Sequence, residues 1–180
     1  MAVRNGVAFS LVSLALTSLV FASIANAQPG VNINPFCVKA LDKAFCSEVV
    51  KPADTWQEAI TEVLSETIMQ AKMAEPIMAN LLTTLPSTLD AKFKDNIGLA
   101  CRKSYEDVLD LLKEVEEALK TGDKTKVANI KLSSAYTRLE DCADEFSKTQ
   151  MPAEFSTFYE GSKKLLSTCL AVERTRPDII

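Results

Sequence analysis

The sequence contains no histidine. This absence excludes hydrolases that rely on a histidine base, and it excludes zinc sites built on imidazole ligands. It also excludes the di-metal centres of helical bundles, which use Glu-x-x-His ligands. Only five of the 180 residues are glycine, and none of them belongs to a phosphate-binding loop. Several common catalytic and cofactor-binding sites are therefore excluded at the outset.

Apolar runs long enough to span a bilayer are absent beyond residue 27. Residues 1–27 themselves have the three parts of a secretory signal peptide: Arg4, an apolar stretch over 7–22, and the A-x-A site Ala25-Asn26-Ala27. We expect cleavage before Gln28, and an uncleaved anchor helix is the alternative. No N-x-[ST] acceptor with a permitted middle residue is present, so N-glycosylation is not expected.

The remaining chain, 28–180, has the length of one domain. Loss of Arg4 takes the net charge from −4 to −5, which argues against nucleic acid or anionic lipid as a partner. The acidic residues around Cys142 have no apolar setting that would raise a carboxyl pKa for acid–base catalysis. No EF-hand spacing is present. We therefore predict a protein that is not an enzyme and has no metal or cofactor.

Helical periodicity dominates the mature chain, and no window alternates with period two. We expect a small helical hairpin over 34–51 and a bundle over 52–174. Within the bundle, helices are predicted from about Asp54 to Leu85, broken by Pro76, and then over 87–120, 123–149 and 152–173. Ser87 and Asp90 resemble a capping box, and Arg174 to Ile180 is expected to fray. Short connections make neighbouring helices antiparallel, so the fold class is all-α, an up-down-up-down four-helix bundle.

Two cysteines are placed to bridge a helical hairpin. Gly122 suits the left-handed position that ends one helix, and Asp123 can cap the amides of the next. Cys101 lies about 20 residues before this turn and Cys142 about 20 after it, so antiparallel helices rising about 1.5 Å per residue bring both sulfurs to one height. A bridge here closes a long loop, which the chain-entropy relation values at about 4 kcal/mol.

The other three cysteines are Cys37, Cys46 and Cys169. Cys37 and Cys46 are close enough to form a local clip, with two independent buried thiols as the alternative. Cys169 lies roughly 16 Å from the height of Cys142 on the next helix, too far for a bridge. We therefore expect Cys169 to be unpaired, either as a small buried apolar residue or as a reactive or intermolecular thiol.

The pattern around these cysteines resembles the plant invertase/pectin methylesterase inhibitor domain. That family runs like Cys-x3-Tyr, Leu-Ser-Ala-Ala and Cys-x3-Phe. Here the same places read Cys101-Arg-Lys-Ser-Tyr105, Leu132-Ser-Ser-Ala135 and Cys142-Ala-Asp-Glu-Phe146. The signal peptide, the Cys37-x8-Cys46 spacing and Thr121-Gly-Asp add to the resemblance, which covers Cys37 to Val172.

The resemblance implies a four-helix bundle preceded by a helical hairpin, with one disulfide inside the hairpin and one between neighbouring bundle helices. It also implies a non-catalytic protein that binds a pectin methylesterase or an acid invertase in the cell wall or vacuole. We expect this chain to be secreted to the cell wall (apoplast). Invertase inhibitors of the family resemble one another in a Pro-Lys-Phe stretch after the Gly-Asp turn. Here the stretch reads Lys124-Thr125-Lys126-Val127, which favours pectin methylesterase as the target.

Two hypotheses of function follow. In the first, the acidic faces of 87–120 and 123–149 cover the target's substrate cleft, with Tyr105, Tyr136, Asp123 and Lys124 as candidate contacts. In the second, the chain is a secreted binding module for an apolar ligand or a structural partner. Met69 and Met73 near Pro76 would then line a pocket, although methionines at such positions also fill cores.

Overall fold

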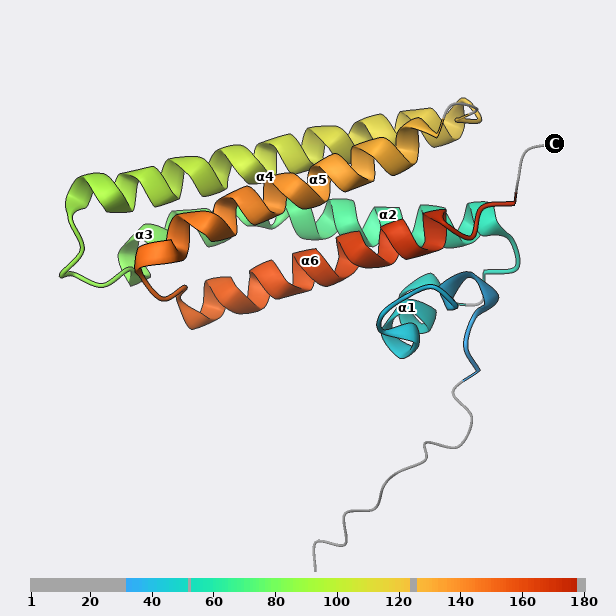
Figure 1. The fold of residues 1–180 in the computed structure, drawn as a ribbon, viewed down its shortest axis with the longest axis horizontal. Helices are drawn as coiled ribbons and strands as arrows, with labels where there is room; N and C mark the ends of the chain where they lie inside the picture. Colours follow the sequence, from blue (N-terminus) through green and yellow to red (C-terminus); the bar gives the residue numbers. More distant parts are fainter. Residues whose placement is uncertain (1–31, 52, 124–125, 178–180) are drawn as a thin grey trace, which may run out of the picture. The chain divides into compact units, whose positions relative to one another are not determined.

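The computed structural model describes residues 32–51, 53–123 and 126–177. Residues 32–180 form one compact unit. Its elements are η1 (Pro35–Cys37), α1 (Lys43–Val50), α2 (Trp56–Lys72), α3 (Ala74–Thr84), α4 (Ala91–Lys120), α5 (Val127–Asp144), η2 (Glu145–Lys148) and α6 (Ala153–Glu173) (Figure 1). No strand occurs in the described ranges, so the predicted all-α class is confirmed. None of the described helices is long and apolar enough to cross a membrane. The expected signal peptide, 1–27, lies outside the described residues.

The predicted break near Pro76 is confirmed, and its position follows from the proline ring. A proline inside a helix clashes with the carbonyl group four residues earlier and lacks the N–H that would bond to it. For Pro76 that earlier residue is Lys72, and α2 ends at Lys72. Met73 joins α2 to α3. The start of α2 is fixed by a capping box between Thr55 and Glu58.

The predicted cap of α4 is wrong by one turn. The helix begins at Ala91, and Asp90 is its N-cap, whose Oδ1 accepts from the backbone N–H groups of Lys92 and Phe93 at 2.9 and 3.3 Å. Ser87 lies in the turn before it. An aspartate at the N-cap also interacts favourably with the positive end of the helix dipole, so Asp90 satisfies two requirements at once.

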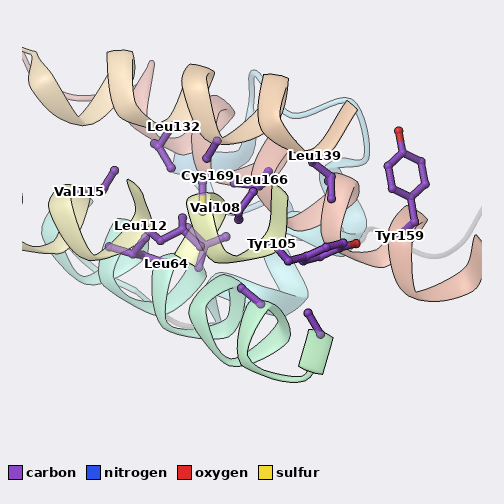
Figure 2. Packing of buried hydrophobic residues seen from close by; sticks show 14 of the residues in the cluster. Leu64, Tyr105, Val108, Leu112, Val115, Leu132, Leu139, Tyr159, Leu166 and Cys169 are labelled. Atoms are coloured by element: carbon purple, nitrogen blue, oxygen red, sulfur yellow. The ribbon is translucent and has the colours of Figure 1, made fainter. Parts of the chain in front are cut away.

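The four long segments form the predicted up-down-up-down bundle. Helix α4 packs on α5, α5 on α6, and α6 on α2, while α2 and α3 together pack on α4 (Figure 1). Their apolar stripes meet in one core, in which Leu64, Val108, Leu112, Leu132 and Leu166 lie together (Figure 2). Each of these side chains is at most 3% exposed. Burial of an aliphatic side chain contributes about 1.5–3 kcal/mol, so this core is the main source of stability.

The N-terminal hairpin is held together by the predicted Cys37–Cys46 disulfide, with the two Cα atoms 5.6 Å apart. Polar contacts attach it to α6. The Lys164 ammonium lies 2.8 Å from the Asp42 carboxylate and 4.0 Å from the centre of the Phe45 ring. Lys39 donates to the carbonyl oxygen of Arg174. The pair with Lys164 also lowers the pKa of Asp42 below its usual value.

The expectation that residues 174–180 fray is wrong for the described part of that segment. The Thr175 and Arg176 N–H groups donate to the carbonyls of Val172 and Glu173, which continues the turn after α6. The guanidinium of Arg176 lies over the Trp56 ring, 4.6 Å from its centre. Trp56 Nε1 in turn donates to the Val172 carbonyl at 3.0 Å. These contacts hold the chain after α6 against the start of α2.

Candidate partner-binding surface

The α4–α5 turn has a well-defined hydrogen-bonded structure. Gly122 has φ +89°, the left-handed conformation that only glycine adopts without strain. The Asp123 N–H donates to Ala118 at 2.9 Å and the Gly122 N–H to Leu119 at 3.2 Å, which together form a Schellman motif. The turn therefore satisfies the last carbonyls of α4 as the sequence predicted.

Asp123 caps α5, as predicted, but from four residues before the helix begins. Its Oδ1 accepts from the Val127 N–H at 2.7 Å and its Oδ2 from the Ala128 N–H at 3.2 Å. Its carboxylate also receives the Arg176 guanidinium, with Nη2 2.6 Å from Oδ2. The side chain is only 1% exposed, so the suggestion that Asp123 contacts a partner is wrong. Lys124, the other candidate at this turn, lies outside the described residues.

Arg176 also joins the last turn of α6 to the Asp123 carboxylate at the α4–α5 turn. Its Nη2 lies 3.1 Å from Glu173 Oε1, and Glu173 Oε2 accepts from the Asn129 amide at 2.9 Å. The three charged side chains are each at most 10% exposed. One guanidinium therefore pairs with two buried carboxylates, and the group links α4, α5 and α6. We refer to Asp123, Glu173, Arg176 and Trp56 as the C-terminal clamp.

The predicted bridge between α4 and α5 is present at the other end of this hairpin. Cys101 and Cys142 form a disulfide with Cα atoms 4.4 Å apart, and both side chains are fully buried. The hairpin is thus fixed covalently at one end and by the clamp at the other. A surface built on α4 and α5 is accordingly rigid, which lowers the entropy lost on binding a partner.

Tyr105 is not the surface anchor that the sequence analysis suggested. It is 3% exposed and lies inside the bundle (Figure 2), and the centre of its ring is 5.3 Å from that of the Phe158 ring. Its hydroxyl donates to Ser162 Oγ at 3.5 Å, and burial raises the pKa of the phenol. The position follows Cys101 by four residues and precedes Val108 by three, so Tyr105 lies on the buried stripe of α4.

Tyr136 lies half-buried on α5, at the seam with α6. The Lys163 ammonium lies 5.9 Å from the centre of its ring and 5.6 Å from that of Tyr159. Lys163 also pairs with Glu140 at 2.9 Å. Burial, with the Glu140 carboxylate next to the phenol, raises the pKa of Tyr159 to about 12. Of the two tyrosines proposed as anchors, only Tyr136 reaches the surface.

The outer surface of the α4–α5 hairpin is charged. We call it the α4–α5 face, and it comprises Lys103, Asp107, Asp110, Glu114, Glu117, Lys131, Arg138 and Asp141. This face carries five carboxylates and three basic groups. Lys131 pairs with Glu114 across the helices, and Arg138 lies 3.8 Å from Asp107. Exposed pairs of this kind contribute about 0–1 kcal/mol each, so they do not lock the surface against a partner.

The described residues offer no grouping of three or more metal-ligand side chains. The unpaired Cys169 is fully buried between helices (Figure 2), and its sulfur lies 3.2 Å from Thr67 Oγ1. Burial raises the pKa of this thiol to about 12, so it stays protonated at physiological pH. The structure thus favours the interpretation of Cys169 as a buried apolar residue.

The profile of the family described as plant invertase/pectin methylesterase inhibitor matches residues 31–172. The chain belongs to this family. It is accordingly an enzyme inhibitor and not a catalyst. The structure of a mutant form of a pectin methylesterase inhibitor from Arabidopsis is similar, with a TM-score of 0.65 and 20% identity over 79% of this chain and 95% of that one. A pectin methylesterase inhibitor from Arabidopsis thaliana gives 0.59 and 21%, over 78% and 93%. No curated protein matches the sequence.

The family's bundle and both of its disulfides are therefore present in this member. The sequence analysis missed the C-terminal clamp, because Arg176 and Asp123 are 53 residues apart and neither lies on a periodic stripe. Trp56 is the only tryptophan of the chain, but nothing near it in the sequence identifies Arg176 as the cation that lies over its ring.

Proposed function

We propose that residues 28–180, released from a signal peptide over 1–27, form a secreted inhibitor of pectin methylesterase that acts in the cell wall. The observation that carries the proposal is the family match over residues 31–172. The likeness to two pectin methylesterase inhibitor structures is consistent with it, since at 20–21% identity it supports the fold. The A-x-A site at Ala25-Asn26-Ala27 supports export.

In the proposed mechanism the α4–α5 face covers the target's substrate cleft. The hairpin is rigid because a disulfide holds one end and the C-terminal clamp holds the other. Such preorganisation lowers the entropy lost on binding, so more of the contact energy appears as affinity. The excess of carboxylates favours a partner whose cleft is rimmed by basic groups, and it accelerates association at low salt. Tyr136 is the aromatic side chain placed to anchor the edge of the contact.

The choice of pectin methylesterase over invertase rests on the segment after the α4–α5 turn. The family's invertase inhibitors resemble one another in a Pro-Lys-Phe stretch that this chain lacks. Lys126, directly before α5, has a left-handed backbone with φ 56°, and its side chain accepts no hydrogen bond from the first turn of α5. A proline could not adopt that backbone conformation, because its ring holds φ near −65°.

A parallel titration tests the proposal. Purified 28–180 with intact disulfides is added to a plant pectin methylesterase and to a cell-wall invertase at mildly acidic pH, and both activities are measured. We expect only the esterase to lose activity, and we expect added salt to weaken this inhibition. Loss of invertase activity alone would show that the Pro-Lys-Phe stretch is dispensable and would overturn the choice of target. Full activity of both enzymes at micromolar protein would overturn the proposed function.

A further inference from the structure

A hollow of about 590 Å³ lies between α2 and α4, on the side of the bundle away from α5. We call it the α2–α4 groove. Its apolar wall consists of Leu64, Ile68 and Met69 from α2 and Leu119 from α4. Leu64 and Leu119 belong to the core, whereas Met69 is 56% exposed. Its volume lies within the range of roughly 300–1,000 Å³ that is typical of small-molecule sites.

The groove is positively charged although the chain is acidic. Lys72, Lys113 and Lys120 line it, and Glu116 is the single carboxylate in its lining, so its local charge is +2 against a net charge of −4 for the chain. Glu116 pairs with Lys120 at 3.4 Å, and Asp110 pairs with Lys113 from outside the lining. Lys72 has no ion pair among the described residues. It also lines a second hollow of about 460 Å³ against α3, so it stands where the two meet.

We propose that the α2–α4 groove binds a small amphipathic anion, a ligand with an apolar body and one acidic group. The apolar body would lie against Leu64, Ile68, Met69 and Leu119, where contact with water is replaced by contact with the side chains. The acidic group would lie among the lysines, with Lys72 as its principal partner. Charge complementarity selects the anion, because a neutral or cationic ligand of the same shape gains nothing from the Lys72 ammonium, which has no ion pair among the described residues. This binding activity is independent of enzyme inhibition.

The chain contains its own reporter for this site. Trp56 is the only tryptophan, and the small hollow beside it shares Gln57 and Leu119 with the α2–α4 groove. A dye bound in the groove therefore lies close enough to accept excitation energy from Trp56. The probe is 1-anilinonaphthalene-8-sulfonate, which has an aromatic body and one sulfonate. It is added to purified 28–180, and its emission is recorded on excitation of the tryptophan and on direct excitation.

Two variants remove the two features that the proposal uses. Lys72→Glu/Lys120→Glu reverses the local charge, and Ser65→Phe fills the groove while all charges remain. Both sets of side chains are exposed, so the helices should form as before, which circular dichroism verifies. The matched control is Lys43→Glu/Lys92→Glu, which makes the same change of charge at exposed positions outside the groove.

We expect the dye to bind the original protein saturably and with sensitised emission. Its affinity should be at least tenfold weaker in each groove variant and unchanged in the control variant. Dodecanoate should displace the dye, and dodecyltrimethylammonium should not. The proposal is overturned if binding is not saturable, or if the groove variants bind as the original protein does. Displacement by the cationic detergent as readily as by dodecanoate would also overturn it, because the lysines would then have no role.

Discussion

Arg176 donates to the Asp123 carboxylate across 2.6 Å, and this ion pair joins the end of α6 to the turn between α4 and α5. The same carboxylate caps α5 through two backbone N–H groups. The guanidinium lies over the only tryptophan of the chain, and a second carboxylate, Glu173, lies 3.1 Å away. One arginine outside the regular elements therefore links four helices: α2 through Trp56, α4 and α5 through Asp123, and α6 through Glu173.

Removing this arginine should destabilise the fold strongly. Arg176→Ala leaves Asp123 and Glu173 buried without their shared cation, which costs about 3–5 kcal/mol when a buried pair is broken. Urea unfolding followed by Trp56 fluorescence measures the change. Arg174→Ala is the matched control, because the Arg174 side chain is exposed and makes no ion pair among the described residues. Equal stability of the two variants would show that the clamp contributes nothing.

The two disulfides should contribute unequally. Cys101 and Cys142 are 41 residues apart and Cys37 and Cys46 only nine. On the chain-entropy relation, removing the first bridge costs about 4 kcal/mol and removing the second about 2.5–3 kcal/mol. Thermal unfolding of the two double Cys→Ala variants tests this order. A greater loss from the Cys37/Cys46 variant would mean that strain or residual structure, and not loop length, decides the contribution.

Alkaline pH should destabilise the protein. Burial raises the pKa of Cys169 from 9.0 to about 12 and that of Tyr159 from 10.0 to about 12, and it raises the pKa of Tyr105 further. The unfolded chain therefore releases these protons first. Well below pH 9.0 all three groups are protonated in both states, and as the pH rises through 9.0 toward about 12 the free energy of unfolding falls.

Urea titrations at several pH values measure this dependence, with Cys169→Ala as the comparison. The variant should lose less stability between pH 9 and 11 than the original protein, because one of the three groups is gone. Labelling with a thiol reagent gives a second readout, since Cys169 should react only after denaturation. Rapid labelling of the native protein near pH 8 would contradict the buried, protonated thiol.

Tyr136 and Tyr105 should differ in their effect on inhibition. Tyr136→Ala removes an aromatic group at the proposed contact, and loss of an interface anchor costs about 2 kcal/mol or more, which weakens inhibition roughly 30-fold. Tyr105→Phe keeps the buried ring and removes only a hydroxyl at 3.5 Å from Ser162, so inhibition should not change. Inhibition constants against a pectin methylesterase compare the two. Unchanged inhibition by Tyr136→Ala would place the contact elsewhere on the bundle.

The parts of this fold that the sequence predicts are those set by local or equally spaced features. Pro76 ends α2 through a clash four residues back, and Gly122 stops α4 because it alone accepts the required φ. Cys101 and Cys142 meet because their distances from the turn are equal. Tyr105 could have been placed correctly, since its spacing from Cys101 puts it on the buried stripe of α4.

The clamp and the α2–α4 groove follow from tertiary contacts that no local pattern reveals. Arg176 sits in a polar terminal segment typical of frayed ends, and only the return of α6 beside the α4–α5 turn brings it to Asp123. Lys72, Lys113 and Lys120 are separated among acidic residues in the sequence, and the packing of α2 on α4 brings them together around one hollow. Asp123 was predicted both to cap the helix after the turn and to contact a partner. Its two capping bonds and its pairing with Arg176 leave no exposed carboxylate oxygen for a partner.

Competition with substrate tests most directly the claim that this chain closes the cleft of a pectin methylesterase. Fluorescently labelled 28–180 is titrated with the esterase, alone and at a series of high concentrations of methylated oligogalacturonide, and the dissociation constant is read from anisotropy. The account predicts one chain bound per enzyme and an apparent dissociation constant that rises in proportion to the oligosaccharide concentration. Binding that is unaffected by the oligosaccharide, or no binding at micromolar concentration, would contradict it.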